Sequence, residues 1–158
     1  MIRGADKGMK AKFGQAAYVW TGLRSIKASQ ADARVRIDGA DWFEGETSCV
    51  LVGNVGTVTG GLRAFEAAEP DDGWLEVGVV TAKGAVQWAR TFGRAVVGTA
   101  ANSPFVRTTR AKSIDVRFDR PVVYELDGGD RKAVKHLEIT IEPGAIEICV
   151  PESPAPTV

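Results

Sequence analysis

The sequence predicts a mainly β protein, an antiparallel β-sandwich with two short helices. Two observations lead to this fold class. Apolar and polar residues alternate over 33–37, 114–118, 137–141 and 146–150, which is the pattern of strands with one buried face. Turn residues separate these segments at short intervals, and only two segments have a helical period, so helices do not alternate with strands as around a parallel sheet.

Composition excludes several classes of protein. The 158 residues are 44% hydrophobic, which suffices for one domain with a core. Twenty basic and twenty acidic residues cancel, so we expect no nucleic-acid partner, because such proteins usually present a basic face. The chain has two cysteines, Cys49 and Cys149, and one histidine, His136. A structural zinc site needs about four such ligands, so neither that site nor a disulfide framework is expected.

The first helical segment covers residues 1–28. Its apolar residues recur at spacings of three and four: Met9, Phe13, Ala17, Trp20, Leu23 and Ile26. A helix facing the core is the favoured interpretation, and a basic helix on a membrane surface is the alternative. No segment reaches the ~18 uncharged apolar residues of a membrane span, so we expect a cytoplasmic protein, at most peripheral to the membrane.

The strand pattern begins at Ala33, where the period changes from 3.6 to 2. We predict strands over 33–37, 42–44, 48–52, 75–81, 105–109, 114–118, 122–126, 137–141 and 146–150. Asp38-Gly39 predicts a hairpin turn, and Pro143-Gly144 predicts the last turn. The segment 48–52 is continuously apolar, which predicts a strand covered on both faces.

The second helical segment covers residues 84–97, with Gly98 at its end. Val86, Ala89, Phe92 and Val96 share one face of this predicted helix. We assign residues 1–151 to one domain and the proline-containing residues 152–158 to a disordered tail or linker. The tryptophans are expected in the core rather than stacked on a ligand: Trp20, Trp42, Trp74 and Trp88.

Two glycine-containing segments each allow two interpretations. The segment 53–61, GNVGTVTGG, is expected to be a crossing between strands that needs positive φ, and a phosphate nest is the alternative. It lacks the Lys-Ser/Thr pair of a Walker loop. Asp71-Asp72-Gly73 is either a solvated turn or an oxygen-rich site for a hard cation.

One further turn and the histidine have no clear chemical role in the sequence. Asp127-Gly128-Gly129 lies between two predicted strands and reads as a hairpin turn. His136 has no nucleophile motif such as GxSxG around it, so Ser-His-Asp catalysis is not predicted. It is expected to be an exposed strand residue.

The order of these motifs resembles the C-terminal domain of the bacterial diacylglycerol kinase-like lipid kinases. The resemblance runs from Lys12–Tyr18, similar to the family's Lys-x-Gly-x-x-Ala-Tyr helix, to the closing segment 148–151. Between them lie a strand ending in Asn54, the pair Gly60-Gly61 and the acidic turn. The C-terminal domain of an NAD kinase shares this fold, but the sequence lacks that family's Gly-Ser-Thr-Ala-Tyr segment. It also lacks the Gly-Gly-Asp-Gly-Thr loop of the kinases' N-terminal nucleotide-binding domain.

The resemblance implies a function and a set of site residues. The family transfers a phosphoryl group from ATP, with Mg²⁺, to a lipid hydroxyl such as that of diacylglycerol. By resemblance, Asn54, Gly60 and Gly61 face the cleft where nucleotide and lipid meet. Asp72 would supply a carboxylate to a structural Mg²⁺, and Glu69 and Trp74 would supply backbone oxygens.

The resemblance also leaves the general base open. The family has Asp-Gly-Glu at positions 127–129, and its Glu is the proposed base, but this chain has Gly129 there. Asp127 is the candidate base, with Asp130 as the alternative, and Gly129 is expected at positive φ. The chain is thus expected to be the substrate-side domain of a lipid kinase, inactive without the nucleotide-binding domain that would be its partner. The alternative is a stand-alone binding or assembly module, and a homodimer is left open.

Overall fold

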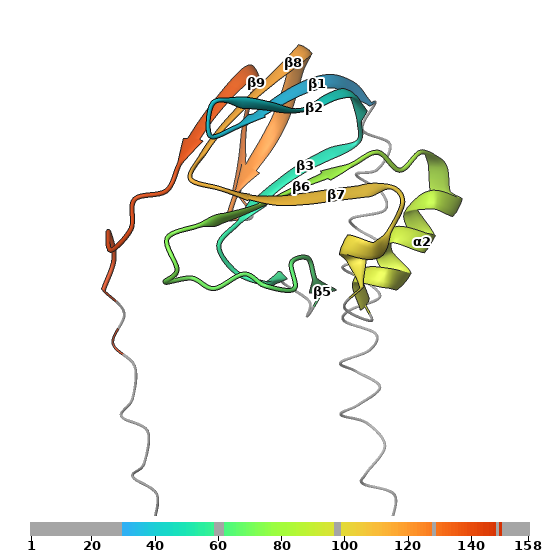
Figure 1. Cartoon of the computed structure of the whole chain (residues 1–158). Helices are drawn as coiled ribbons and strands as arrows, with labels where there is room; N and C mark the ends of the chain where they lie inside the picture. The colour runs from blue at the N-terminus through green and yellow to red at the C-terminus, as the bar shows by residue number, and fades with distance from the viewer. Residues whose placement is uncertain (1–29, 59–61, 97–98, 128, 148, 150–158) are drawn as a thin grey trace, which may run out of the picture.

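The computed structural model describes residues 30–58, 62–96, 99–127, 129–147 and 149 (Figure 1). The described elements are, in order, β1 (Ala31–Ile37), β2 (Ala40–Thr47), β3 (Cys49–Gly53), β4 (Thr57–Val58), β5 (Leu62–Arg63), β6 (Leu75–Val80), α2 (Gly84–Val96), the 3₁₀ helix η1 (Ala100–Asn102), β7 (Val106–Ala111), β8 (Ser113–Leu126) and β9 (Gly129–Thr140). The predicted helix over 1–28 and the predicted tail over 152–158 lie outside the described residues.

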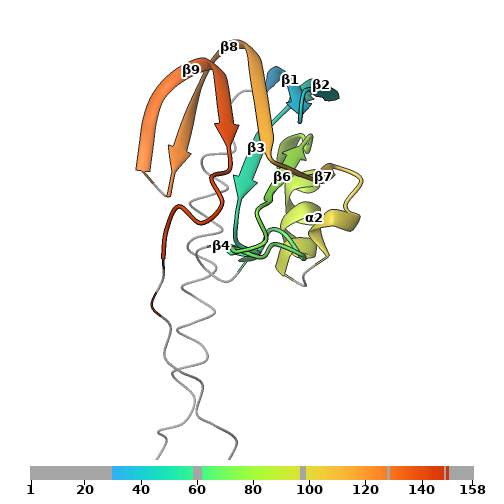
Figure 2. The ribbon, with the colours of Figure 1, turned by 60° about the vertical axis from the view of Figure 1, so that its left-hand side comes forward.

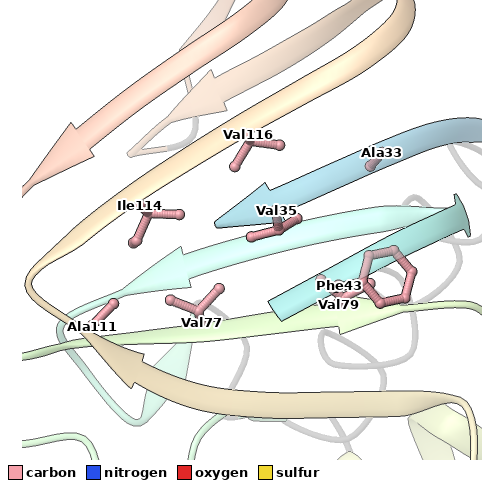
Figure 3. Packing of buried hydrophobic residues seen from close by; sticks show 8 residues of the cluster. All are labelled: Ala33, Val35, Phe43, Val77, Val79, Ala111, Ile114 and Val116. Carbon is pink, nitrogen blue, oxygen red and sulfur yellow. The ribbon is translucent and has the colours of Figure 1, made fainter. Parts of the chain in front are cut away.

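The strands form two main antiparallel sheets, as predicted. A four-stranded sheet has the order β2-β1-β8-β9, a three-stranded sheet has the order β3-β6-β7, and β4 pairs with β5. Figure 3 shows the apolar side chains of the two main sheets meeting between them. This core consists of Ala33, Val35, Phe43, Val77, Val79, Ala111, Ile114 and Val116.

The alternation in the sequence explains why these residues meet. Ala33 and Val35 of β1 are buried, whereas Arg34 and Arg36, which alternate with them, are exposed on the opposite face. Val77 and Val79 are fully buried in β6. Burial of one such aliphatic side chain contributes about 1.5–3 kcal/mol, so this seam dominates the stability of the sandwich.

The turn Asp38-Gly39 joins β1 to β2 as predicted. Asp38 has φ 49° and Gly39 has φ 85°, the signs that a type I′ hairpin turn requires. The Asp38 carboxylate also accepts hydrogen bonds from the backbone N–H groups of Lys112 (2.9 Å) and Ser113 (2.8 Å). One side chain therefore ties the hairpin to the connection between β7 and β8.

β8 and β9 form a long hairpin that divides into two halves. The pairing is regular up to Arg117 opposite His136, then shifts before it resumes at Val122 opposite Val134. Pro121, which cannot donate a backbone hydrogen bond, lies in this bulge. Figure 2 shows β8 and β9 arching over together at the top of the view. The sequence predicted two separate strands, 114–118 and 122–126, where β8 is one bent strand.

The structure shows which residues α2 buries, and it overturns the predicted burial of β3 on both faces. In α2, Val86 is 70% exposed and Ala89 is exposed, whereas Trp88 and Thr91 are buried. The helix packs toward η1 and β5, and the large Trp88 side chain is among the residues that it buries. Strand β3 is half-buried rather than covered on both faces by the described residues, with Leu51 36% exposed.

The predicted strand over 146–150 is also wrong in its described part. Ile146 and Glu147 are not in a strand, and Ile146 is 81% exposed. Gly144 has φ 71°, so the Pro143-Gly144 turn redirects the chain after β9. Alternating sequence alone makes no strand without a neighbour to complete its backbone hydrogen bonds.

Candidate functional site

The acidic turn between β5 and β6 is stabilised by hydrogen bonds within its own segment. The Asp72 Oδ1 atom accepts a hydrogen bond from the Trp74 N–H at 2.9 Å, which is the side-chain turn that Asp favours. The Asp72 N–H points to the Glu69 carbonyl oxygen at 3.5 Å, and Gly73 has φ 75°. This local hydrogen bond and the positive φ of Gly73 are therefore enough to explain the Asp-Gly sequence at this turn.

Arg110 of β7 reaches this turn from the neighbouring strand. Its guanidinium forms an ion pair with Asp72 Oδ2, and its Nε atom lies 3.1 Å from Glu76 Oε1. Arg110 also lies over the Trp74 ring, 5.7 Å from its centroid, and the Lys112 ammonium lies 4.8 Å from the same centroid. We call these five residues, Asp72, Trp74, Glu76, Arg110 and Lys112, the acidic-turn cluster.

Glu76 is the buried acid of the acidic-turn cluster. Its residue exposure is 7%, and burial raises the pKa of its carboxyl group above the ordinary value. Arg110 is close enough to attract the carboxylate, but Glu76 Oε1 accepts no well-aligned hydrogen bond from the described residues. Desolvation therefore outweighs the ion pair at this carboxyl group.

Asn54 brings the end of β3 to the same turn. Its Nδ2 donates a hydrogen bond to the Pro70 carbonyl oxygen at 3.0 Å. Its Oδ1 is buried and accepts no hydrogen bond from the described residues. The structure thus places Asn54 beside the acidic turn, whereas Gly60 and Gly61 lie outside the described residues.

The donor set around the acidic turn fits a hard divalent cation. Such ions take carboxylate and backbone carbonyl oxygens together, and Asp72, Glu69 and Trp74 can offer these groups from one short segment. The buried, unpartnered Oδ1 of Asn54 is a further oxygen beside the turn. Arg110 holds the charge-bearing Oδ2 of Asp72, so a cation and this guanidinium would compete for one atom.

The glycine-rich segment after β3 has a packing role in its described part. The Phe65 ring is buried against Gly53 and Gly78, where an added Cβ would meet ring atoms at 3.3 Å. At Gly56 an added Cβ would lie 2.7 Å from the Phe65 carbonyl oxygen, so only glycine fits. No residue of 53–58 has positive φ, so the described part forms neither the expected positive-φ crossing nor a phosphate nest.

Asp127 lies at the exposed tip of the β8–β9 hairpin. Leu126 pairs with Gly129 across the tip, and Asp127 has φ 48°. Next to it, Glu125 and Asp130 are directly opposite each other, an unfavourable pairing of like charges. The tip presents a solvent-accessible carboxylate, and among the described residues no hydrogen bond or ion pair joins it to the acidic-turn cluster.

The expected backbone of Gly129 is wrong. Gly129 is not among the glycines with positive φ. An added Cβ would instead meet the Leu126 carbonyl oxygen and the Arg131 Nη1 atom, each at 3.3 Å. A side chain at position 129 is therefore limited by close contacts, one of them with a flexible arginine.

Sequence reasoning missed Arg110 and its ion pairs. Arg110 lies in a segment with no motif, and only the pairing of Glu76 with Arg110 across β6 and β7 shows the connection. It likewise missed that the exposed strand residue His136 contacts Asp115. Cross-strand register is the signal that reveals both, and it cannot be read from one segment.

The described tryptophans and cysteines make no nucleophilic site. Trp88 is buried as expected, and Trp42 and Trp74 are half-buried, each with an arginine over its ring. Burial, with a smaller contribution from the Glu125 carboxylate, raises the pKa of the Cys49 thiol to about 11. This thiol is therefore protonated and unreactive at neutral pH.

The part of the chain that the structure describes contains no helix that is long and apolar enough to cross a membrane.

Comparisons with known proteins agree with this architecture. A family model described as the YegS C-terminal NAD kinase beta sandwich-like domain matches residues 2–150. Among curated relatives, a "Probable lipid kinase YegS-like" of Xanthomonas oryzae pv. oryzae is 28% identical over 149 residues, covering 92% of this chain and 47% of the relative. One of the same name from Pseudomonas fluorescens is 29% identical over 157 residues, covering 93% and 48%.

Solved structures show the same fold. A diacylglycerol kinase from Bacillus anthracis superimposes with a TM-score of 0.59 at 25% identity, covering 87% of this chain and 46% of that chain. A second structure from the same organism gives a TM-score of 0.63 at 23% identity, covering 80% and 44%. The chain spans about half the length of the curated relatives it matches.

Proposed function

We propose a function from one premise: the chain belongs to the family of YegS C-terminal, NAD kinase β-sandwich-like domains. It is the substrate-side domain of a lipid kinase that transfers a phosphoryl group from ATP to a lipid hydroxyl such as that of diacylglycerol. The observation that carries this proposal is the match of the family model to residues 2–150, together with relatives named as lipid kinases. ATP would be held mainly by a nucleotide-binding domain of the same kinase.

Asp127 is the proposed general base. Phosphoryl transfer depends mostly on positioning and charge neutralisation, so the substrate domain contributes orientation and a proton acceptor. A base must lie within hydrogen-bond reach of the hydroxyl that it deprotonates. Asp127 offers an exposed carboxylate at a hairpin tip, and a lipid hydroxyl brought to that tip would give its proton to an Asp127 carboxylate oxygen.

The acidic turn is the proposed site of a structural Mg²⁺. Asp72 would supply its carboxylate, and Glu69 and Trp74 would supply backbone carbonyl oxygens. The ion would neutralise the turn and hold β6 against the end of β3. Asn54 supports this placement because it already bridges to the turn through Pro70.

The end of β3 is the proposed cleft-facing surface. Asn54, Gly60 and Gly61 would face the space between this domain and the nucleotide-binding domain. A Gly-Gly pair permits close approach of a ligand or another backbone, which suits a surface where nucleotide and lipid meet.

The test joins the chain to the nucleotide-binding half of a related YegS-like kinase. Transfer of labelled phosphate from ATP to diacylglycerol in mixed micelles is expected from the two-domain protein and not from the chain alone. Calorimetry with Mg-ATP is expected to show no tight binding to the chain alone. Low-micromolar binding by the chain alone, or no transfer by a folded fusion that binds ATP, contradicts the proposal.

The second candidate function is a stand-alone binding or assembly module, and Gly129 favours it. The residue that the family uses as base is missing at this position. A module of this kind would bind lipid vesicles equally with and without ATP and the other domain. Gly129→Glu distinguishes the two candidate functions. If the variant fusion transfers more phosphate than the unmodified fusion, the kinase function is supported. If both fusions are inactive, the binding module is supported.

A further inference from the structure

Three side chains of metal-ligand type lie together on the outer face of the four-stranded sheet. Asp115 pairs with Glu138 across β8 and β9, and Arg117 pairs with His136. Because side chains alternate between the two faces of a strand, these four residues share the face opposite the core. None of them belongs to either acidic turn.

The three ligand atoms are near enough to one another for one ion to reach them all. The closest pair, His136 Nε2 and Asp115 Oδ2, forms a hydrogen bond that an ion would replace. His136 Nε2 lies 2.7 Å from Asp115 Oδ2 and 3.5 Å from Glu138 Oε1. All three ligand atoms lie within 4.8 Å of one another. Zinc holds nitrogen and oxygen ligands at about 2.0–2.2 Å, so neighbouring ligands of a tetrahedral ion are roughly 3.4 Å apart. Small side-chain rotations would bring this set to that spacing.

Arg117 holds the carboxylate of this cluster in position. Its Nε donates a hydrogen bond to Asp115 Oδ1 at 3.0 Å, and its Nη2 makes a longer contact of 3.5 Å with Oδ2. Hydrogen bonding to Arg117 is also the main reason that the pKa of Asp115 is lowered. A carboxylate oriented by an outer hydrogen-bond partner is typical of metal sites, and here Arg117 orients Asp115 while His136 contacts its Oδ2.

The cluster is accessible from solvent. The side chains of His136 and Glu138 are 40% and 74% exposed, and that of Asp115 is 22% exposed. An ion can therefore enter directly, and water can complete its coordination. Imidazole together with carboxylate suits zinc, copper or nickel better than magnesium or calcium, which take oxygen ligands alone.

We propose that Asp115, His136 and Glu138 bind a divalent transition-metal ion of the zinc type, with water in the remaining position. The ion would join β8 to β9 at the last regular pairs before the bulge, so it would stiffen the base of the hairpin whose tip carries Asp127. This inference is independent of the proposed kinase function.

The test uses the full chain after treatment with chelator. His136 is the only histidine in the sequence, so its ring resonances report on one site. Titration with zinc sulfate is expected to shift these resonances and to raise the melting temperature. Magnesium chloride at the same concentration is expected to leave the ring resonances unchanged, which separates this site from the acidic turn.

Variants decide whether three ligands act together. Asp115→Asn and Glu138→Gln should each weaken zinc binding by at least about 10-fold, as even supporting residues of metal sites do. His136→Asn should abolish the zinc-dependent rise in melting temperature. Glu125→Gln is the matched control, because it removes an exposed carboxylate from β8 on the other side of the bulge from the cluster.

The opposite outcomes overturn the proposal. They are ring resonances that do not respond to zinc, or an affinity that is unchanged in Asp115→Asn and Glu138→Gln. The exposed thiol of Cys149 is the competing zinc ligand in the described residues. Cys149→Ser is therefore expected to leave the response of the His136 resonances to zinc unchanged. Loss of that response in Cys149→Ser would also refute the site.

Discussion

Two Asp-Gly turns in this domain have similar sequences and different surroundings. At the first, the Asp72 side chain is 18% exposed, and its two carboxylate oxygens are engaged by the Trp74 N–H and by Arg110. At the second, Asp127 is exposed and makes no hydrogen bond or ion pair with the other described residues. Gly73 has positive φ in the first turn, and Asp127 has positive φ in the second.

This difference shows that a turn motif determines the backbone conformation but not the surroundings of its carboxylate. Asp and Gly favour both turns for the same backbone reason. Whether the carboxylate then stabilises the fold or stays available for chemistry depends on the strand beside it. Arg110 of β7 engages Asp72, and no such cation reaches Asp127 in the described part of the chain.

The largest expected effect falls on the free carboxylate. In an active two-domain protein, Asp127→Asn should lower turnover at least about 10²-fold, because positioned general bases contribute about 10²- to 10⁴-fold. Asp130→Asn, beside it in the hairpin, should cost far less. The measurement is phosphate transfer to diacylglycerol at saturating ATP.

Its control is stability. Asn tolerates the left-handed backbone that Asp127 adopts at φ 48°, so Asp127→Asn should change the free energy of unfolding by less than about 0.5 kcal/mol. Near-full turnover in Asp127→Asn would remove Asp127 as the base and direct the search to the other domain.

Substitution of Asp72, whose carboxylate is paired, should change stability more than substitution of Asp127. Asp72→Ala removes the partner of Arg110 and the acceptor of the Trp74 N–H, so it should lower the free energy of unfolding by about 2 kcal/mol. Urea denaturation of both variants measures this. Equal stabilities of Asp72→Ala and Asp127→Asn would show that the contacts of Asp72 do not stabilise the fold more than those of Asp127.

Sequence reasoning predicted what depends on local pattern. The alternation over 33–37 and 114–118 predicted the core faces of β1 and β8, and Asp38-Gly39 predicted the hairpin turn between β1 and β2. These features depend on residues close together in the sequence, so each segment is enough to predict them. The family resemblance was likewise confirmed by the match over residues 2–150.

What failed depends on contacts between distant segments. The 70% exposure of Val86 in α2, which packs toward η1 and β5, depends on tertiary contacts that the helical period does not show. The ion pair of Asp72 with Arg110 joins a turn to a strand with no motif of its own. The roles proposed for Asp72 and Asp127 therefore remain predictions, although the turns that carry them were foreseen.

A divalent cation should sharpen the comparison further. If Mg²⁺ binds at Asp72, a tenfold excess over its Kd would stabilise the fold by about 1.4 kcal/mol. The melting temperature should rise with millimolar Mg²⁺ and stop responding in Asp72→Asn, whereas Asp127→Asn should respond like the unmodified chain. Arg110→Gln should bind Mg²⁺ more tightly, because it removes the competing guanidinium. An unresponsive unmodified chain and an unresponsive Arg110→Gln would together exclude the site.

The smallest expected effect concerns pH and Glu76, which shares Arg110 with Asp72. Burial raises the pKa of Glu76 in the folded state above its ordinary value of 4.5. The folded state therefore holds this proton more tightly than the unfolded state does. The resulting stabilisation is fully present below pH 4.5 and is lost as the pH rises through the folded pKa.

Glu76→Gln isolates this contribution, because glutamine has the same shape and no titration in this range. Above pH 4.5 the unmodified chain should lose stability relative to Glu76→Gln, and the difference should level off once Glu76 is ionised in both states. Asp115 has a lowered pKa and contributes the opposite slope, lost as the pH falls, but it is present in both proteins and cancels in the difference. Urea denaturation of the pair across this range gives the result directly. A difference that grows in the other direction would mean that the ion pair with Arg110 outweighs burial, and Glu76 would then be an engaged carboxylate of the same kind as Asp72.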